Sequence, residues 1–259
     1  MPYAKLSQAT LYYTVDGPQD APALVLSNSL GTNADMWAPQ LPELARHFRV
    51  LRYDTRGHGL SSVPAGEYRF EQLAEDVREL MDHVGIQRAH LCGLSMGGPT
   101  VMMLALRHPE RVDRLVLSNT AARIGTVESW NARIEAVGRE GLDSMAPGII
   151  ERWLTPAYRA AQPGPTQMLT DMLRRTPVAG YQANCAALRE NDLRPQVGVI
   201  RAPTLVIGGT HDAATTAQQG RELAEAIPGA RYVEFDAAHI ANWEHPQAYG
   251  QAVVAFLKG

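Results

Sequence analysis

Short apolar runs recur along the chain, and turn-forming residues lie between them. Runs of this kind are typical of strands that are buried on both faces of a parallel sheet. We predict strands over residues 10–15, 23–27, 49–53, 89–94, 114–118, 203–207 and 231–235. The first is rich in β-branched and aromatic residues and ends at Asp16-Gly17-Pro18, which favours a turn.

Helical periodicity fills most of the segments between these strands. The clearest case is residues 70–84, where Gly85 is well placed to end the helix. Its apolar stripe consists of Leu73, Val77, Leu80, Met81 and Val84. Further helices are expected over residues 96–108, 216–227 and 246–257. Strands that alternate with helices predict an α/β fold with a mostly parallel sheet and helices on both faces.

One long segment interrupts this alternation. From about residue 122 to residue 200 no convincing strand is found, and helical patches at 130–137, 149–154 and 167–173 are separated by proline and glycine. We therefore predict a helical cap over residues 122–200 that folds over the end of the sheet. The remaining residues, 1–121 and 201–259, would form the core.

Composition and charge exclude several classes of function. The 259 residues carry a net charge of −3, which gives no electrostatic reason to expect nucleic acid or a membrane as partner. No signal peptide is recognised, and no apolar run approaches the roughly 18 residues of a membrane span. Of the two cysteines, Cys92 lies in a predicted buried strand as a core residue, and we expect a cytoplasmic protein. The oligomeric state is not indicated.

The candidate nucleophile is Ser95, at the centre of Gly93-Leu94-Ser95-Met96-Gly97. This G-x-S-x-G sequence lies between a predicted strand and a predicted helix, where a sharp turn would expose the serine. The alternative is a chance glycine-rich turn, which the strand, the helix and the later acid and histidine disfavour. The helix that begins at Met96 would direct its N–H groups at the reaction centre.

Asp212 and His239 complete the predicted triad, because each follows a late strand and the order serine, acid, histidine fits this fold. A loop aspartate or a helix cap is the alternative for Asp212, but Thr215 and Thr216 are better placed to cap the following helix. His58 is the main rival base. It follows an early strand, which breaks the order, and a structural role is favoured for it.

The oxyanion hole is expected to use two backbone N–H groups. One belongs to Met96, directly after the nucleophile, and the other to Leu30 in the loop of residues 27–32. The alternative for this loop is a simple turn of small polar residues. Trp37 is expected to pack against the loop.

Five segments carry a resemblance to a known family across the whole chain. They are SNSLGTNADMW, YDTRGHGLSS, LCGLSMGG, SNTAARIG and WNARI. In these segments, with Asn28-Ser29 where histidine and glycine are common, the chain resembles the 3-oxoadipate enol-lactonases of the α/β-hydrolase fold. The resemblance implies a serine hydrolase that opens a small carboxylated enol-lactone to 3-oxoadipate, without a metal or cofactor. The sequence contains no phosphate loop and no metal-ligand spacing.

A carboxylated substrate requires a cation, and Arg133 is the candidate because it borders an apolar stripe that includes Trp130. The alternative is an arginine that extends along the surface into solvent. Trp130 and Trp153 are candidate pocket walls, with simple packing as the alternative.

Other functions on this fold stay open at this point. They are another small-molecule esterase, a carbon–carbon bond hydrolase, a cofactor-free haloperoxidase and a non-catalytic ligand receptor. Dehalogenase and epoxide hydrolase mechanisms are disfavoured, because they need an aspartate in place of Ser95.

Overall fold

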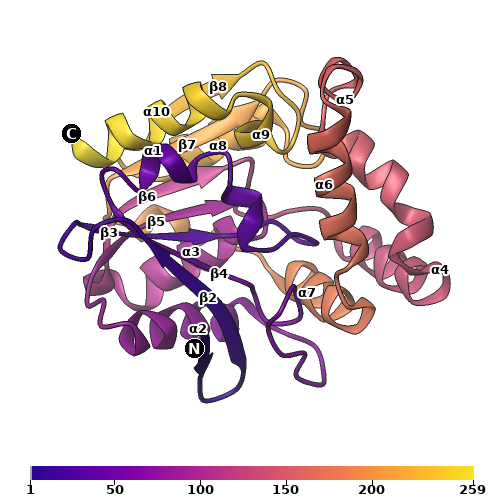
Figure 1. Cartoon of the computed structure of the whole chain (residues 1–259), viewed down its shortest axis with the longest axis horizontal. Helices are drawn as coiled ribbons and strands as arrows, with labels where there is room; N and C mark the ends of the chain where they lie inside the picture. The colour runs from indigo at the N-terminus through magenta and orange to yellow at the C-terminus, as the bar shows by residue number, and fades with distance from the viewer. Residues whose placement is uncertain (1) are drawn as a thin grey trace.

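The computed structural model describes residues 2–259. The strands of this chain form one eight-stranded sheet (Figure 1). The strand order is β1-β2-β4-β3-β5-β6-β7-β8, and all neighbours run parallel except β1 with β2 and β2 with β4. The strands are β1 (Tyr3–Lys5), β2 (Thr10–Asp16), β3 (Ala23–Ser27), β4 (Arg49–Tyr53), β5 (Ala89–Leu94), β6 (Val112–Ser118), β7 (Thr204–Gly209) and β8 (Arg231–Phe235). The expected α/β fold with a mostly parallel sheet is therefore confirmed.

The inner strands are buried along most or all of their length, which explains why apolar runs predicted them well. Every residue of β5 and of β7 is buried. The short edge strand β1 gave no such signal, because Ala4 is its one buried residue. It is recognised as a strand only through its antiparallel pairing with β2.

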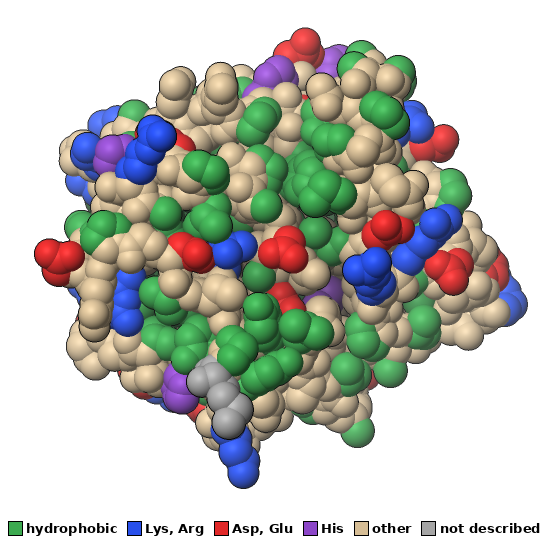
Figure 2. Space-filling view, viewed as in Figure 1, with side chains coloured by type: hydrophobic (Ala, Val, Ile, Leu, Met, Phe, Trp, Pro, Cys, Tyr) green, Lys and Arg blue, Asp and Glu red, His purple; other side chains and the backbone are tan. Residues whose placement is uncertain are grey.

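Helices cover both faces of the sheet (Figure 1). Helices α2 and α3 pack together on one face, and α1 packs against α10 on the other. The core helices are α1 (Leu41–Leu44), α2 (Phe70–His83), α3 (Gly97–Arg107), α8 (Ala217–Ala226), α9 (Ala241–Glu244) and α10 (Pro246–Lys258), with 3₁₀ turns at Ala34–Trp37, Pro109–Arg111 and Val197–Val199. No helix within residues 2–259 is both long and apolar enough to cross a membrane. Acidic and basic side chains are interspersed on the face seen in Figure 2.

The helical insertion lies between β6 and β7 and is called the cap below. It consists of α4 (Val127–Trp153), α5 (Pro156–Ala161), α6 (Pro163–Arg174) and α7 (Val178–Glu190), drawn in salmon to orange in Figure 1. Helix α4 is kinked at Gly141, where φ is 73°. The cap boundaries at residues 122 and 200 stay a prediction.

Helix α7 was not predicted from the sequence, and its burial explains why. Eight of its residues are buried, from Gly180 through to Leu188, so no single apolar stripe marks it. Its backbone approaches the loop after β4 so closely that a side chain on Gly180 would overlap the carbonyl of Gly57. Asn184 reinforces this contact by donating a hydrogen bond of 3.0 Å to the carbonyl of Arg56.

A buried ion pair also holds the loop after β4 in place. Both guanidinium nitrogens Nε and Nη2 of Arg56 lie 2.6 Å from the carboxylate oxygens of Asp76 in α2. The side chains are only 2% and 6% exposed. A buried pair with this bidentate geometry is costly to break, because removal of one partner leaves the other charge uncompensated.

We therefore expect Asp76→Ala to lower the free energy of unfolding by about 3–5 kcal/mol, because it leaves the buried Arg56 guanidinium without a counter-charge. Asp143→Ala is the matched control, since it removes an exposed partner of Arg174, and the expected loss is about 0–1 kcal/mol. Urea unfolding of both variants measures the difference. Equal losses would contradict the role assigned to the buried pair.

Candidate active site

Ser95 lies on the turn between β5 and α3, and its φ of 56° is in the left-handed region that non-glycine residues rarely adopt. A side chain on Gly93 would overlap the carbonyl of Gly97, and one on Gly97 would overlap the carbonyl of Ser27. The two glycines are thus required by close approach. The Ser95 N–H donates to the carbonyl of Ser118 over 2.9 Å, which ties the turn to β6.

Asp212 and His239 lie side by side, although they are 27 positions apart in the sequence. The distance from His239 Nδ1 to Asp212 Oδ2 is 2.8 Å, and both side chains are buried. Because a carboxylate only accepts hydrogen bonds, Nδ1 carries the proton and Nε2 is left as the acceptor. Ser95 and His239 line the same cavity but form no hydrogen bond within the described structure. Such contacts often tighten only when substrate binds.

The Asp212 carboxylate is surrounded by donors. Oδ1 accepts from the N–H groups of Ala214 and Thr215, at 2.8 and 2.9 Å. Oδ2 also accepts from the Thr215 hydroxyl at 2.8 Å and from Asn119 Nδ2 at 3.1 Å. Burial alone would raise the pKa of Asp212, but His239 and the Thr215 donors outweigh it, so the pKa lies below its ordinary value. The carboxylate therefore stays ionised.

The support that Asn119 and Thr215 give to Asp212 was not predicted from the sequence. Asn119 follows β6 with a left-handed φ of 45°, and its amide also donates to the carbonyl of Ala238, next to His239. Thr215 was expected as a helix cap, and this is wrong: Thr216 alone caps α8, while Thr215 binds Asp212. An asparagine directly after a buried strand is the one signal that could have indicated such a role.

The loop after β3 holds the predicted oxyanion donor, Leu30. Trp37 does pack this loop, since its indole nitrogen donates to Asn28 Oδ1 over 2.9 Å. Within residues 2–259 the N–H groups of Leu30 and Met96 have no protein acceptor. Two unpaired backbone donors beside Ser95 are what an oxyanion hole requires.

His58 supports this loop, which fits the structural role favoured for it. Its Nε2 accepts the N–H of Gly31 over 2.9 Å, directly after Leu30. Since Nε2 accepts, the proton of the neutral ring resides on Nδ1, 3.4 Å from the carbonyl of Arg56. Burial lowers the pKa of His58 to about 4, although the bond to Arg56 opposes the shift. The ring is thus a neutral acceptor.

The predicted cap residues Trp130, Arg133 and Trp153 all line the cavity that contains Ser95 and His239. Arg133 donates to the hydroxyl of Tyr181 over 3.2 Å. No ion pair joins Arg133 to a carboxylate within the described structure. The remaining lining residues were not predicted, and they are Ser29, Ile124, Ile149, Arg152, Tyr181, Leu188 and Ala214.

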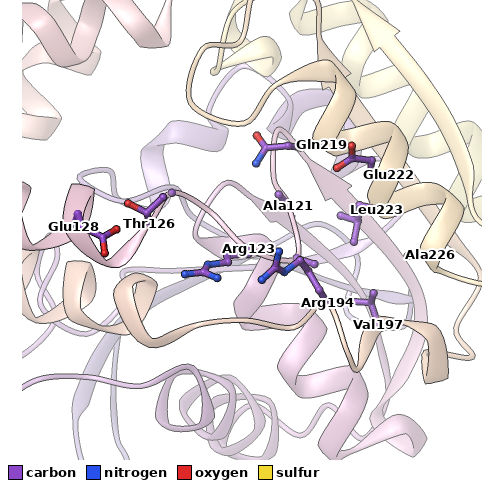
Figure 3. Close-up of a pocket in the computed structure, with 12 residues that line it drawn as sticks. Ala121, Arg123, Thr126, Glu128, Arg194, Val197, Gln219, Glu222, Leu223 and Ala226 are labelled. Atoms are coloured by element: carbon purple, nitrogen blue, oxygen red, sulfur yellow. The ribbon is translucent and has the colours of Figure 1, made fainter.

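A larger cavity, of about 460 Å³, lies between residues 121–126 and helix α8 (Figure 3). None of the predicted triad lines it. Arg123 and Arg194 lie opposite Glu222, which extends from α8, with Glu128 at one end. Its charges are balanced, and no serine, cysteine or histidine lines it. We therefore assign the chemistry to the smaller cavity, which contains Ser95 and His239.

Within residues 2–259 no group of three or more histidine, cysteine, aspartate or glutamate side chains is arranged to hold a metal ion.

A family model described as the alpha/beta hydrolase fold matches residues 22–141 and 154–246. The chain belongs to the α/β-hydrolase family. It is 43% identical to 3-oxoadipate enol-lactonase 2 of Acinetobacter baylyi, over 96% of this chain and 93% of that protein. The crystal structure of the enol-lactonase from Burkholderia xenovorans LB400 is 51% identical, with a TM-score of 0.98 and full coverage of both chains. A thermophilic esterase from Thermogutta terrifontis is 29% identical, with a TM-score of 0.91 over 98% and 95% of the two chains.

The buried histidine of this α/β-hydrolase predicts a loss of stability in acid. The pKa of His58 is about 4 in the folded chain, against 6.5 ordinarily, so between these values only the unfolded chain binds the proton. The free energy of unfolding should therefore fall by about 3 kcal/mol from this group as the pH drops from 6.5 to 4.

His58→Gln keeps an acceptor for Gly31 but cannot titrate. Urea unfolding at several pH values should therefore give a shallower decline for this variant than for the wild type. Parallel curves would show that His58 does not cause the decline.

Proposed function

We propose that this chain hydrolyses 3-oxoadipate enol-lactone to 3-oxoadipate, a step in the breakdown of aromatic compounds. The observation that carries the proposal is full-length similarity to proteins named for this activity, one at 51% identity and a TM-score of 0.98. The similarity extends through the cap, which supplies much of the cavity wall beside Ser95. The substrate is thus a small carboxylated lactone.

In the first half of the reaction His239 Nε2 removes the proton from the Ser95 hydroxyl, and Oγ attacks the lactone carbonyl. The N–H groups of Leu30 and Met96 stabilise the negative charge that develops on the carbonyl oxygen. The ring C–O bond then breaks. The enolate leaves, takes the proton from the His239 imidazolium and becomes the ketone. Asp212 stabilises the imidazolium while His239 holds the proton.

In the second half a water molecule gives its proton to His239 and attacks the acyl-enzyme. The bond between the acyl carbon and Ser95 Oγ breaks, and His239 returns the proton to Ser95. The product is the open-chain diacid. Every step uses side chains and N–H groups of this chain alone.

Arg133 is proposed to bind the free carboxylate of the substrate. It lines the cavity, has no carboxylate partner within residues 2–259, and is oriented by the Tyr181 hydroxyl. A guanidinium suits a carboxylate because it can donate two parallel hydrogen bonds. Trp130 and Trp153 would form apolar walls, and the Trp130 indole is fixed by its bond of 2.6 Å to the carbonyl of Ile124.

The cytoplasm is the proposed location. Both Cys92 and Cys185 are buried and unpaired. Free buried thiols of this kind agree with a reducing compartment.

The proposal is tested by the ultraviolet absorbance loss of freshly generated 3-oxoadipate enol-lactone. The wild type should turn it over, and Ser95→Ala should lower kcat at least about 10⁴-fold, because no acyl-enzyme can form. If the wild type turns over p-nitrophenyl acetate but not the lactone, the triad stands and the substrate assignment fails.

Replacement of Arg133 by methionine tests the carboxylate site. Arg133→Met should raise KM for the lactone about 10- to 100-fold, since one charged hydrogen-bonding partner is lost. KM for neutral p-nitrophenyl acetate should hardly change. Arg139→Met is the control, because Arg139 lies on the same helix but is 69% exposed. Equal effects on both substrates would contradict the assignment.

A further inference from the structure

Glu244, at the end of α9, bridges the histidine loop to the cap. Its Oε1 accepts the N–H of Ala238, directly before His239, over 2.7 Å. The same carboxylate accepts from the Thr155 hydroxyl and, over 3.3 Å, from the Thr155 N–H. Thr155 connects α4 to α5. Within the described residues Glu244 has no cationic partner, and its protein donors are the groups of Ala238 and Thr155.

A second contact joins the same two segments. The N–H of Ile240, directly after His239, donates to the carbonyl of Trp153 over 2.9 Å. Both neighbours of His239 are therefore tied to the α4–α5 junction of the cap, one directly and one through Glu244. Trp153 also lines the cavity, so the junction that holds the histidine loop is part of the substrate-binding wall.

We propose that Glu244 is a positioning residue that keeps His239 in place while the α4–α5 junction of the cap is docked, and so couples cap position to catalysis. The inference rests on the proposed roles of Ser95 and His239, but not on the identity of the lactone. Glu244 acts through Ala238 and does not touch the reacting atoms.

The physical basis is the cost of an unsatisfied buried amide. Ala238 is only 3% exposed, so its N–H needs an acceptor, and a carboxylate gives a stronger bond than a neutral group. If that bond is weakened, the loop that carries both Ala238 and His239 is held less tightly, and His239 can shift. A displacement of about 1 Å at a catalytic group can cost about 100-fold in rate.

The test uses Glu244→Gln, Thr155→Val and the double variant, with hydrolysis of p-nitrophenyl acetate as the assay. Glutamine keeps the size of the side chain but is neutral and has a single acceptor oxygen, so the N–H groups of Ala238 and Thr155 no longer share a carboxylate. Glu225→Gln is the matched control, because it makes the same change on the exposed surface of α8. Thermal unfolding and circular dichroism verify that each variant is folded.

We expect Glu244→Gln to lower kcat about 10- to 100-fold while KM for this small ester changes less than about twofold. Thr155→Val should lower kcat by a smaller factor. The double variant should be no worse than Glu244→Gln, because the effect of Thr155 passes through Glu244. Glu225→Gln should match the wild type.

Three results would overturn the inference. They are an unchanged kcat in folded Glu244→Gln, a rise in KM alone, and multiplicative effects in the double variant. A wild type that hydrolyses the ester but not the lactone would refute the proposed substrate only, and the ester data would still decide the role of Glu244.

Discussion

Burial of the negative charge on Asp212 is the constraint around which the site is organised. A carboxylate removed from water must be compensated by donors, or it takes up a proton. Its donors come from Asn119 after β6, from Thr215 in its own loop after β7 and from His239 after β8. These three strands are adjacent in the sheet, so their carboxyl ends meet where the charge lies. The order of the strands thus brings together the donors that keep the buried Asp212 ionised.

The segment 118–120 joins this acid to the nucleophile. The carbonyl of Ser118 accepts the N–H of Ser95, and the Thr120 hydroxyl donates to the carbonyl of Ser95 over 2.8 Å. Asn119, between them, turns the other way to reach Asp212, which its left-handed backbone permits. One tripeptide therefore holds both ends of the triad at a fixed separation. The strain at Ser95 and Asn119 is maintained because the surrounding hydrogen bonds leave the backbone no alternative.

The central sheet and the triad were accessible from the sequence because each has a local signal. The buried strands are continuous apolar runs, and the glycines around Ser95 form a short motif that lies within five consecutive residues. The supports of the site lack such a signal. Asn119 meets Asp212 across 93 positions, and Glu244 meets Thr155 across 89, so neither pairing leaves a periodic pattern. Helix α7 was missed for a different reason, since burial on several sides removes amphipathic periodicity.

The cap is connected to the chemistry at two separate places, which limits how far it can vary independently of the core. Near the oxyanion loop, Asn184 of α7 donates to the carbonyl of Arg56 in the loop after β4, and His58 of that β4 loop accepts the N–H of Gly31 in the oxyanion loop. A side chain on Gly31 would meet Leu173 and Tyr181 of the cap, so the two surfaces are in direct contact. At the histidine loop, Trp153 holds Ile240 directly, and Thr155 is linked to Ala238 through Glu244.

Substitutions that reshape the substrate cavity from the cap therefore act on groups that also place the oxyanion donor and the base. A change at the α4–α5 junction alters specificity and rate together, whereas a change on the outer surface of α6 reaches neither loop. Specificity and catalysis are thus linked, because residues of the cavity wall also support the reacting groups. Trp153 is an example, since it lines the cavity and accepts the N–H of Ile240, next to His239.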